Sequence, residues 1–252
     1  IALGHKGKLV KDYLQIAHVD VKFFFVNVDN YEGEGSGLGL SLLLCERYLQ
    51  QPFIFSSCDT LVQGKIPEPN NNWMGYGLTD DLSKYRTLNI NDNKVSEIFE
   101  KGFNKHNSKP YIGIAGVNDY KVFWNSMRDG GVESINQGES YAMKSLLKIS
   151  KIYANKFDWF DTGSVDSLQV TKNKYISNNE PNILEKEDEA IWFVGKNVIK
   201  YSNNKDFISN RIKRSTKLKG YVPNIHSYNS NMFCYKKIKG EMLSKIVNKS
   251  IL

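Results

Sequence analysis

One apolar run in this sequence stops abruptly on an acid. Phe53–Ser57 reads F-I-F-S-S and is followed by Cys58, Asp59 and Thr60. Strand-like and helix-like segments alternate before it, which predicts a parallel sheet with helices on its faces. In an open sheet of this kind, ligands bind outside the carboxyl ends of the strands, where Asp59 would lie.

Apolar periodicity and turn residues predict the remaining elements of a chain of 252 residues. We expect strands over residues 1–3, 21–28, 53–57, 73–78, 87–90 and 111–117, and a strand end with a turn over 158–164. We expect helices over residues 8–17, 38–49, 97–102, 120–127, 138–153 and 165–175. After residue 182 we expect two strand pairs, 190–194 with 197–201 and 225–228 with 232–236, on either side of a basic helix over 206–218.

A polar, proline-containing break over residues 178–182 is the best domain boundary in the chain. It predicts an α/β domain over residues 1–178, with a mostly parallel or mixed sheet flanked by helices. It also predicts a smaller α+β unit over residues 183–252.

Charge and cysteine content narrow the class of protein. The net charge is +7, which we attribute to a general abundance of Lys and Asn rather than to an anionic partner. The one dense basic group has no interleaved aromatic residues, so we expect no nucleic-acid partner; it comprises Arg211, Lys213, Arg214, Lys217 and Lys219. The three cysteines are far apart and form no C-x-x-C pair, which favours a reducing cytoplasm over a disulfide framework or zinc site. No run of apolar residues is long enough for a membrane span.

A second acid follows an aromatic pair much later in the chain. Trp159–Ser164 reads W-F-D-T-G-S and places Asp161 in a D-T-G turn. Two carboxylates that converge at a sheet edge can hold one Mg²⁺ against a nucleotide phosphate, so Asp59 and Asp161 are candidate metal ligands and catalytic residues. Each acid could instead only form a turn or cap a helix.

A glycine-rich loop, G-E-G-S-G-L-G over residues 33–39, enters a predicted helix. Exposed amides at a helix start can receive phosphate or line a nucleoside, which makes Gly35, Ser36 and Gly37 candidate nucleotide-binding residues. The loop could equally be a flexible turn. It is not the G-x-G-x-x-G dinucleotide pattern, because Leu38 and Leu40 occupy the positions of the last glycine.

Two further charged residues have both a functional and an ordinary interpretation. Glu139 follows Gly138 at a predicted helix start, where it could face a substrate or simply interact with the helix dipole. Lys200 ends a predicted strand and would matter if that strand belonged to a kinase-like lobe.

Residues 1 to about 175 resemble the sugar-phosphate nucleotidylyltransferases, which have a GT-A-like α/β fold. The resemblance rests on F-I-F-S-S-C-D-T, on Y-I-G-I-A-G-V over residues 111–117, and above all on W-F-D-T-G-S, close to the family pattern W-x-D-T-G-T. It implies that Asp59 and Asp161 bind the catalytic metal ion, here Mg²⁺. The family begins with a strand and a G-x-G-x-R loop that this sequence lacks, and because Ile1 begins inside an element we expect the sequence to be truncated.

Residues from about 183 to 252 resemble the small lobe of the choline kinase and aminoglycoside phosphotransferase group. I-W-F-V-G-K-N-V-I-K-Y would supply the strand lysine, Lys200, that contacts ATP phosphates. The catalytic loop of that group would lie beyond Leu252. The resemblance implies a partial kinase-like lobe without a complete kinase site.

Together these features predict a Mg²⁺-dependent nucleotidyltransferase. The phosphate of a phosphorylated sugar or small metabolite would attack an NTP, release pyrophosphate and form a precursor for bacterial surface polysaccharide, such as a capsule. One alternative is a GT-A glycosyltransferase, although its usual D-x-D is absent from S-S-C-D-T. Another is a non-catalytic nucleotide-binding module.

Overall fold

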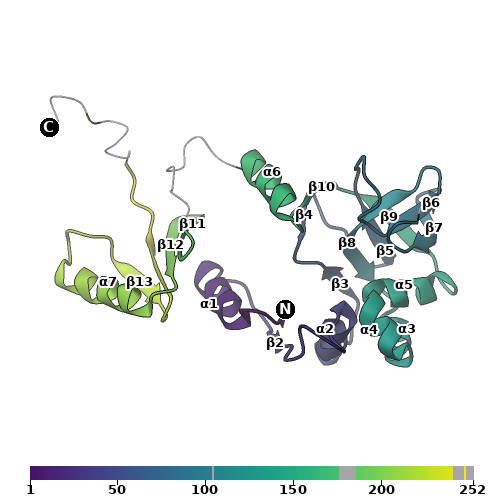
Figure 1. Cartoon of the computed structure of the whole chain (residues 1–252), viewed down its shortest axis with the longest axis horizontal. Coiled ribbons are helices and arrows are strands. Elements are labelled where there is room, and N and C mark those ends of the chain that lie inside the picture. The colour runs from purple at the N-terminus through teal and green to yellow at the C-terminus, as the bar shows by residue number, and fades with distance from the viewer. Residues whose placement is uncertain (104, 176–185, 241–246, 248–252) are drawn as a thin grey trace. The chain divides into compact units, whose positions relative to one another are not determined.

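The computed structural model describes residues 1–103, 105–175, 186–240 and 247. The chain divides into two compact units, whose elements can be followed in Figure 1. One unit comprises Val28–Ile176 with Ala2. The other comprises Ile1, Leu3–Asn27 and the residues from Ser177 onward, so Leu3–Asn27 belongs with the carboxyl-terminal segment rather than with the rest of residues 1–178. The expected break at 178–182 lies outside the described residues, and the functional assignment of the two domains stays a prediction.

The unit Val28–Ile176 is built on a six-stranded sheet in the order β3-β8-β5-β9-β7-β6. Its strands are β3 (Phe53–Ser56), β5 (Asn72–Tyr76), β6 (Thr87–Asn91), β7 (Lys94–Phe99), β8 (Lys109–Val117) and β9 (Ile152–Lys156). Only β5 and β9 are parallel neighbours; the other paired strands are antiparallel. The sheet is therefore mixed, which is one of the two forms expected from the sequence. The other expected form, a mostly parallel sheet, is wrong. The reason is that β1 (Ala2–Leu3) and β2 (Val26–Asn27) pair in a separate two-stranded sheet and add no parallel strand beside β3.

Helices cover one face of this sheet (Figure 1). They are α2 (Leu38–Cys45), the 3-10 turn η1 (Glu46–Tyr48), α3 (Tyr120–Asp129), α4 (Gly131–Gln137) and α5 (Glu139–Leu147). Alternation along β8 separates the two faces, as a strand period of two requires. Ala115 and Val117 pack with the helices in the main core, whereas Ile112 and Ile114 lie in a second core on the other face.

A short two-stranded sheet contributes to that second core. β4 (Thr60–Gln63) pairs antiparallel with β10 (Asp158–Asp161), and Val62 and Trp159 pack against the buried Ile112 and Ile114. The register places Asp161 opposite Thr60. Helix α6 (Val165–Tyr175) follows directly. The pairing of β4 with β10 thus brings two segments that are distant in sequence to one end of β8.

The other unit contains a four-stranded sheet in the order β11-β12-β14-β13. Its strands are β11 (Glu189–Val194), β12 (Asn197–Ser202), β13 (Ile225–Tyr228) and β14 (Met232–Lys236), and its helices are α1 (Gly7–Ala17) and α7 (Lys205–Lys217). All neighbouring strands are antiparallel, which confirms the two predicted strand pairs. Helix α1 packs through Ile16 and Ala17 against Ile199 and Met232 of this sheet.

Several element predictions were wrong. Residues 97–102 were predicted as a helix, but strand β7 extends to Phe99. This strand pairs with β6, and its side chains Val95 and Ile98 pack in the main hydrophobic core. The predicted helix over 138–153 ends at Leu147 and is followed by β9. Strand β4 was not predicted, and of the strand expected over 21–28 only Val26–Asn27 forms.

None of the helices in the described part of the chain has the length and apolar character that crossing a bilayer requires.

Candidate functional site

A cavity of about 340 Å³ opens beside the carboxyl ends of β3 and β10 and the first half of β8, within the unit Val28–Ile176. Its lining combines three kinds of side chain. The acids are Asp59, Glu139 and Asp161; the cations are Lys84, Arg86 and Lys101; the aromatic residues are Tyr85, Tyr111 and Trp159. Acids, cations and aromatic rings in one concave space are typical of a site for a charged small molecule.

Asp59 is held by the segment that carries Asp161. The Thr162 amide donates to the backbone carbonyl of Asp59 at 3.0 Å, and the Thr162 hydroxyl donates to the same carbonyl at 2.9 Å. On the other side, the Thr60 hydroxyl donates to the carbonyl of Ile112 on β8. The loop after β3 is therefore attached both to the central sheet and to the end of β10.

The side chain of Asp161 is held by a hydrogen bond to each of its two carboxylate oxygens. The Gly163 amide donates to its Oδ1 at 2.9 Å, and the Tyr85 hydroxyl donates to its Oδ2 at 2.9 Å. The Thr171 hydroxyl of α6 donates to its backbone carbonyl at 3.0 Å. The Asx-turn expected for Asp161 is present, but the carboxylate also lines the cavity, so the turn and the functional interpretation are compatible.

The two candidate metal ligands face the same space beside Gly163. A Cβ built on Gly163 would lie 3.2 Å from Asp161 Oδ1 and 3.3 Å from Asp59 Oδ2. Both carboxylates therefore border the same space, and glycine leaves the approach to them open. Two carboxylates combined with substrate phosphates and water are the ligand set that Mg²⁺ prefers. Among the described residues, no group of three or more His, Cys, Asp or Glu side chains is placed to hold a metal by itself.

The Tyr85 hydroxyl holds the orientation of Asp161 at neutral pH. Burial, together with the hydrogen bond to Asp161 and its charge, raises the pKa of Tyr85 to about 12. The phenol therefore keeps its proton and remains a donor at neutral pH. The Trp159 ring meets the Tyr85 ring edge-on, with centroids 5.1 Å apart, which limits the rotation of Tyr85.

Glu139 lies at the start of α5 and is only 2% exposed. Burial is the main cause that raises its pKa above the ordinary value, although the neighbouring Tyr111 and Arg86 oppose the shift. Glu139 Oε2, the Tyr111 hydroxyl and the Trp159 indole nitrogen have no hydrogen-bond partner of normal geometry in the described part of the chain. Glu139 and Tyr111 are still near enough to influence each other's titration. Buried polar atoms without partners that line one cavity indicate a ligand or ordered water.

The loop before β6 contributes the cations Lys84 and Arg86 to the cavity, and the turn after β7 contributes Lys101. Arg86 Nε pairs with Glu100 Oε2 at 3.0 Å, and Lys144 also pairs with Glu100. Glu100 therefore orients Arg86 beside the cavity. The short segment S-K-Y-R over residues 83–86 supplies Lys84, Tyr85 and Arg86 to the lining. In the sequence this segment is indistinguishable from an ordinary polar loop; its alternation of cations with tyrosine before a strand is the one signal that points to a site.

The structure brings together three of the seven residues predicted for the site, Asp59, Asp161 and Glu139. Gly35, Ser36 and Gly37 are not in the cavity lining, although the next residue, Leu38, is. A Cβ on Gly37 would lie 2.5 Å from the carbonyl oxygen of Ile135, so this glycine permits close packing against α4. Lys200 lies in the other unit, where its Nζ is 3.3 Å from Glu189 Oε2. The roles assigned to all seven residues stay predictions.

Comparison with protein-family models gives no match for this sequence, and comparison with curated protein sequences gives none either. Comparison with solved structures does give matches, and they include sugar-phosphate nucleotidylyltransferases and a phosphocholine cytidylyltransferase. A Bacillus anthracis protein assigned as a glucose-1-phosphate thymidylyltransferase is 19% identical, with a TM-score of 0.55 over 71% of this chain and 78% of that one.

CTP:phosphocholine cytidylyltransferase from Streptococcus pneumoniae is 15% identical, with a TM-score of 0.54 over 67% of this chain and 75% of that one. A UDP-glucose pyrophosphorylase is 17% identical, with a TM-score of 0.54 over 69% of this chain and 79% of that one. At these identities the likeness establishes the fold. The nucleotidyltransferase-like fold expected from the sequence is confirmed, whereas the kinase-like lobe stays a prediction.

Proposed function

We propose that this protein is a nucleotidyltransferase that joins the nucleoside monophosphate of an NTP to a phosphorylated small molecule and releases pyrophosphate. The observation that carries the proposal is the convergence of Asp59 and Asp161 beside Gly163, in a cavity that also contains three cations. The solved structures of the same fold that act on nucleotides and phosphorylated acceptors support it.

Asp59 and Asp161 are the residues that would hold Mg²⁺. When bound, the ion would neutralise phosphate charge and help to align the reacting groups. Tyr85 and the Gly163 amide hold the Asp161 carboxylate, and Thr162 holds the Asp59 backbone, so the ligand pair needs little rearrangement on binding. Preorganised groups of this kind lower the cost of reaching the transition state.

The cations would bind the phosphate of the acceptor. Its oxygen attacks the α-phosphorus of the NTP, the bond from that phosphorus to the β-phosphate oxygen breaks, and the electron pair leaves with pyrophosphate. A phosphate anion is already a nucleophile, so no protein group has to remove a proton or form a covalent intermediate. Lys84, Arg86 and Lys101 have the charge and location to position that anion.

The far end of the acceptor would contact Glu139. Its unpartnered Oε2 can accept a hydrogen bond from a sugar hydroxyl or pair with an ammonium group, and Tyr85, Tyr111 and Trp159 offer aromatic surface beside it. The names of the solved structures include both a glucose-1-phosphate enzyme and a phosphocholine enzyme. The acceptor class is therefore a phosphorylated sugar or a phosphorylated amino alcohol, and the product would be an activated head group for a bacterial surface polysaccharide.

The carboxyl-terminal sheet is proposed as a partial kinase-like small lobe with Lys200 as its phosphate-binding lysine. Lys200 lies on β12, and its Nζ is 5.0 Å from the ring centroid of Phe207 on α7. It also forms a salt bridge with Glu189 on the neighbouring strand β11. The test of this role is ATP-dependent phosphorylation of the unphosphorylated acceptor by the protein expressed from its full gene.

One experiment tests the proposed function. The protein expressed from its full gene is incubated with Mg²⁺, each of the four NTPs, and either a hexose 1-phosphate or phosphocholine, and pyrophosphate is measured. Asp161→Asn should abolish release, whereas Asp158→Asn, an exposed acid on the same strand, should not. Unchanged turnover in Asp161→Asn would remove Asp161 from the mechanism. Transfer of a sugar from a nucleotide sugar without pyrophosphate release would support the glycosyltransferase alternative instead.

A further inference from the structure

The positive charge of this protein is concentrated in one part of the chain. Residues 190–240 contain 11 lysine and arginine residues and a single acid, Asp206. Residues 28–176 contain 16 lysine and arginine residues and 18 acids, so the catalytic-site unit is slightly acidic. A general abundance of lysine does not explain this separation, and the net charge of +7 requires a local explanation.

Helix α7 carries the densest part of this charge on its solvent side. Ile208 is fully buried, and Ile212 and Ser215 are half-buried on the same side of the helix. With about 3.6 residues per turn, the exposed side chains listed next project from the opposite side. They are Lys213, Arg214 and Lys217.

These three cations are not paired with an acid in the part of the chain that the structure describes. No salt bridge within the described residues includes any of them. Lys213 and Lys217 are four residues apart, a spacing at which like charges repel along a helix. An arrangement that weakens the helix in isolation becomes favourable next to an anionic surface.

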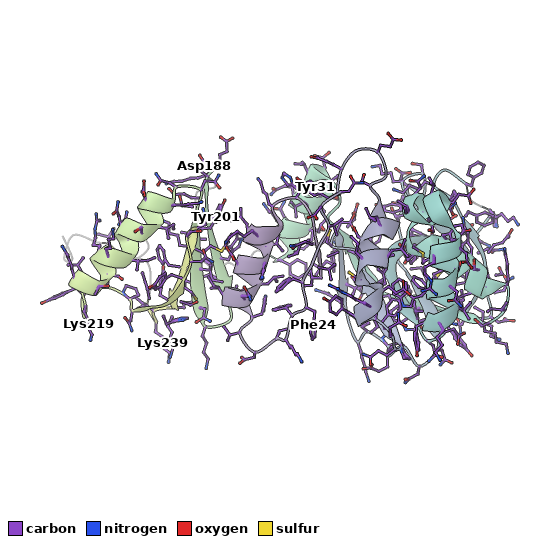
Figure 2. The ribbon with its side chains drawn as sticks, turned by 90° about the horizontal axis from the view of Figure 1, so that it is seen from below. Phe24, Tyr31, Asp188, Tyr201, Lys219 and Lys239 are labelled. Atoms are coloured by element: carbon purple, nitrogen blue, oxygen red, sulfur yellow. The ribbon has the colours of Figure 1, made fainter. Side chains whose placement is uncertain are left out.

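The end of α7 adds apolar side chains to the charged surface. Leu218 is 40% exposed and Tyr221 is 90% exposed, and Val222 is exposed beside them. Lys219 lies between Leu218 and Tyr221 in the sequence, just beyond the carboxyl-terminal end of α7 (Figure 2). A tyrosine and two aliphatic residues flanked by cations suit the boundary between lipid headgroups and acyl chains.

We propose that this basic tip, defined as Lys213–Val222, binds the surface of an anionic phospholipid bilayer. Lys213, Arg214, Lys217 and Lys219 would contact phosphate headgroups, and Leu218, Tyr221 and Val222 would enter the interface. Each basic residue near such a surface contributes roughly fivefold to the binding constant. A lipid surface fits better than nucleic acid because Tyr221 is the one aromatic residue of the tip, so the tip offers no row of rings on which successive bases could stack.

Vesicle co-sedimentation of the whole protein tests this inference. Binding should occur to phosphatidylcholine vesicles that contain a third phosphatidylglycerol and not to phosphatidylcholine alone, and it should fall steeply with added salt. The triple variant Lys213→Glu, Arg214→Glu, Lys217→Glu should bind at least 100-fold more weakly. The variant Tyr221→Ser should bind several-fold more weakly while keeping the salt dependence.

A matched control distinguishes binding by the basic tip from a general effect of the protein's net charge. The triple variant Lys121→Glu, Lys148→Glu, Lys151→Glu changes the charge equally at exposed positions of the other unit, and it should bind vesicles almost normally. Circular dichroism would verify that each variant is folded. Equal losses in both triple variants would overturn the inference, as would binding to pure phosphatidylcholine. Tighter binding of homopolymer RNA than of anionic vesicles, lost in the α7 variant, would assign the tip to nucleic acid instead.

Discussion

The hydroxyl and the backbone amide of Thr162 both donate to the backbone carbonyl of Asp59, at 2.9 and 3.0 Å, across 103 positions of sequence. This pair of hydrogen bonds joins the loop after β3 to the turn after β10. It is the direct reason that the carboxylates of Asp59 and Asp161 approach the same point beside Gly163.

Replacement of Thr162 should weaken metal binding without unfolding the protein. Thr162→Val preserves the shape and the backbone hydrogen bond but removes the hydroxyl donor, which contributes on the order of 1 kcal/mol. We expect the Mg²⁺ concentration for half-maximal pyrophosphate release to rise about fivefold. Thr162→Ser keeps the donor and should remain near wild type, and equal behaviour of the two variants would contradict the role of the hydroxyl.

Tyr85→Phe tests the orientation of Asp161. The substitution removes the donor to Asp161 Oδ2, and we expect kcat to fall about tenfold. Because the pKa of Tyr85 is raised to about 12, its phenol is neutral from pH 6 to 9, so the shape of the pH profile should not change over that range. The neutral phenol's contribution to stability is present below pH 10 and is lost as the pH rises through about 12.

A pH profile of Tyr85→Phe that differs in shape from wild type between pH 6 and 9 would contradict this account. Tyr175→Phe provides a matched control at a tyrosine outside the cavity, where the hydroxyl accepts a hydrogen bond from Gln63 Nε2 at 2.8 Å.

Glu139→Gln should trade substrate affinity for stability. Burial raises the pKa of Glu139, so the folded protein favours the neutral acid, and the cost of burying its charge develops as the pH rises above the ordinary value of 4.5. The Gln variant avoids this cost. Its thermal midpoint should exceed that of the wild type at pH 8 and match it at pH 4, while KM for the acceptor rises more than kcat falls. A lower midpoint at pH 8 would show that the carboxylate stabilises the fold.

Gly113→Ala should damage both stability and activity. Gly113 has a φ of 73° within β8, and an added Cβ would lie 2.3 Å from Ser57 Oγ beside Asp59. Strain and steric overlap together should cost about 2–3 kcal/mol. Gly131→Ala is the control: Gly131 also has a positive φ, 52°, but no atom lies within 4 Å of a Cβ added there. If thermal denaturation shows equal losses in the two variants, the close approach to Ser57 has no role.

The sequence predicted the local elements of this fold more successfully than their pairing. Strands with strong alternation and clear turns, such as Asn197–Ser202 after Gly195, are correct to within a residue. The error at Glu97–Gly102 arose because a short mixed segment fits both helical and strand periods, and only its pairing with β6 decides between them. The antiparallel pairing of β3 with β8 depends on contacts distant in sequence, which no local pattern encodes.

The candidate site was partly predictable for a similar reason. Asp59 and Asp161 could be found because each follows an apolar strand and occurs in a distinctive motif. Lys84, Tyr85 and Arg86 were missed because their loop has no apolar period, and they enter the cavity only through the tertiary fold. In the glycine loop, Gly37 has a packing role against α4, which the sequence pattern does not distinguish from nucleotide binding.

Manganese binding measured by electron paramagnetic resonance tests the central claim most directly. Mn²⁺ would be titrated into the protein expressed from its full gene, with NTP and acceptor present, and into its Asp59→Asn, Asp161→Asn, double and Asp158→Asn variants. The account predicts one tight ion in the wild type and in Asp158→Asn, a loss of at least tenfold in affinity in either single variant, and little further loss in the double variant, because both carboxylates hold the same ion. Wild-type affinity in either single variant, or independent losses of two separate ions, would contradict it.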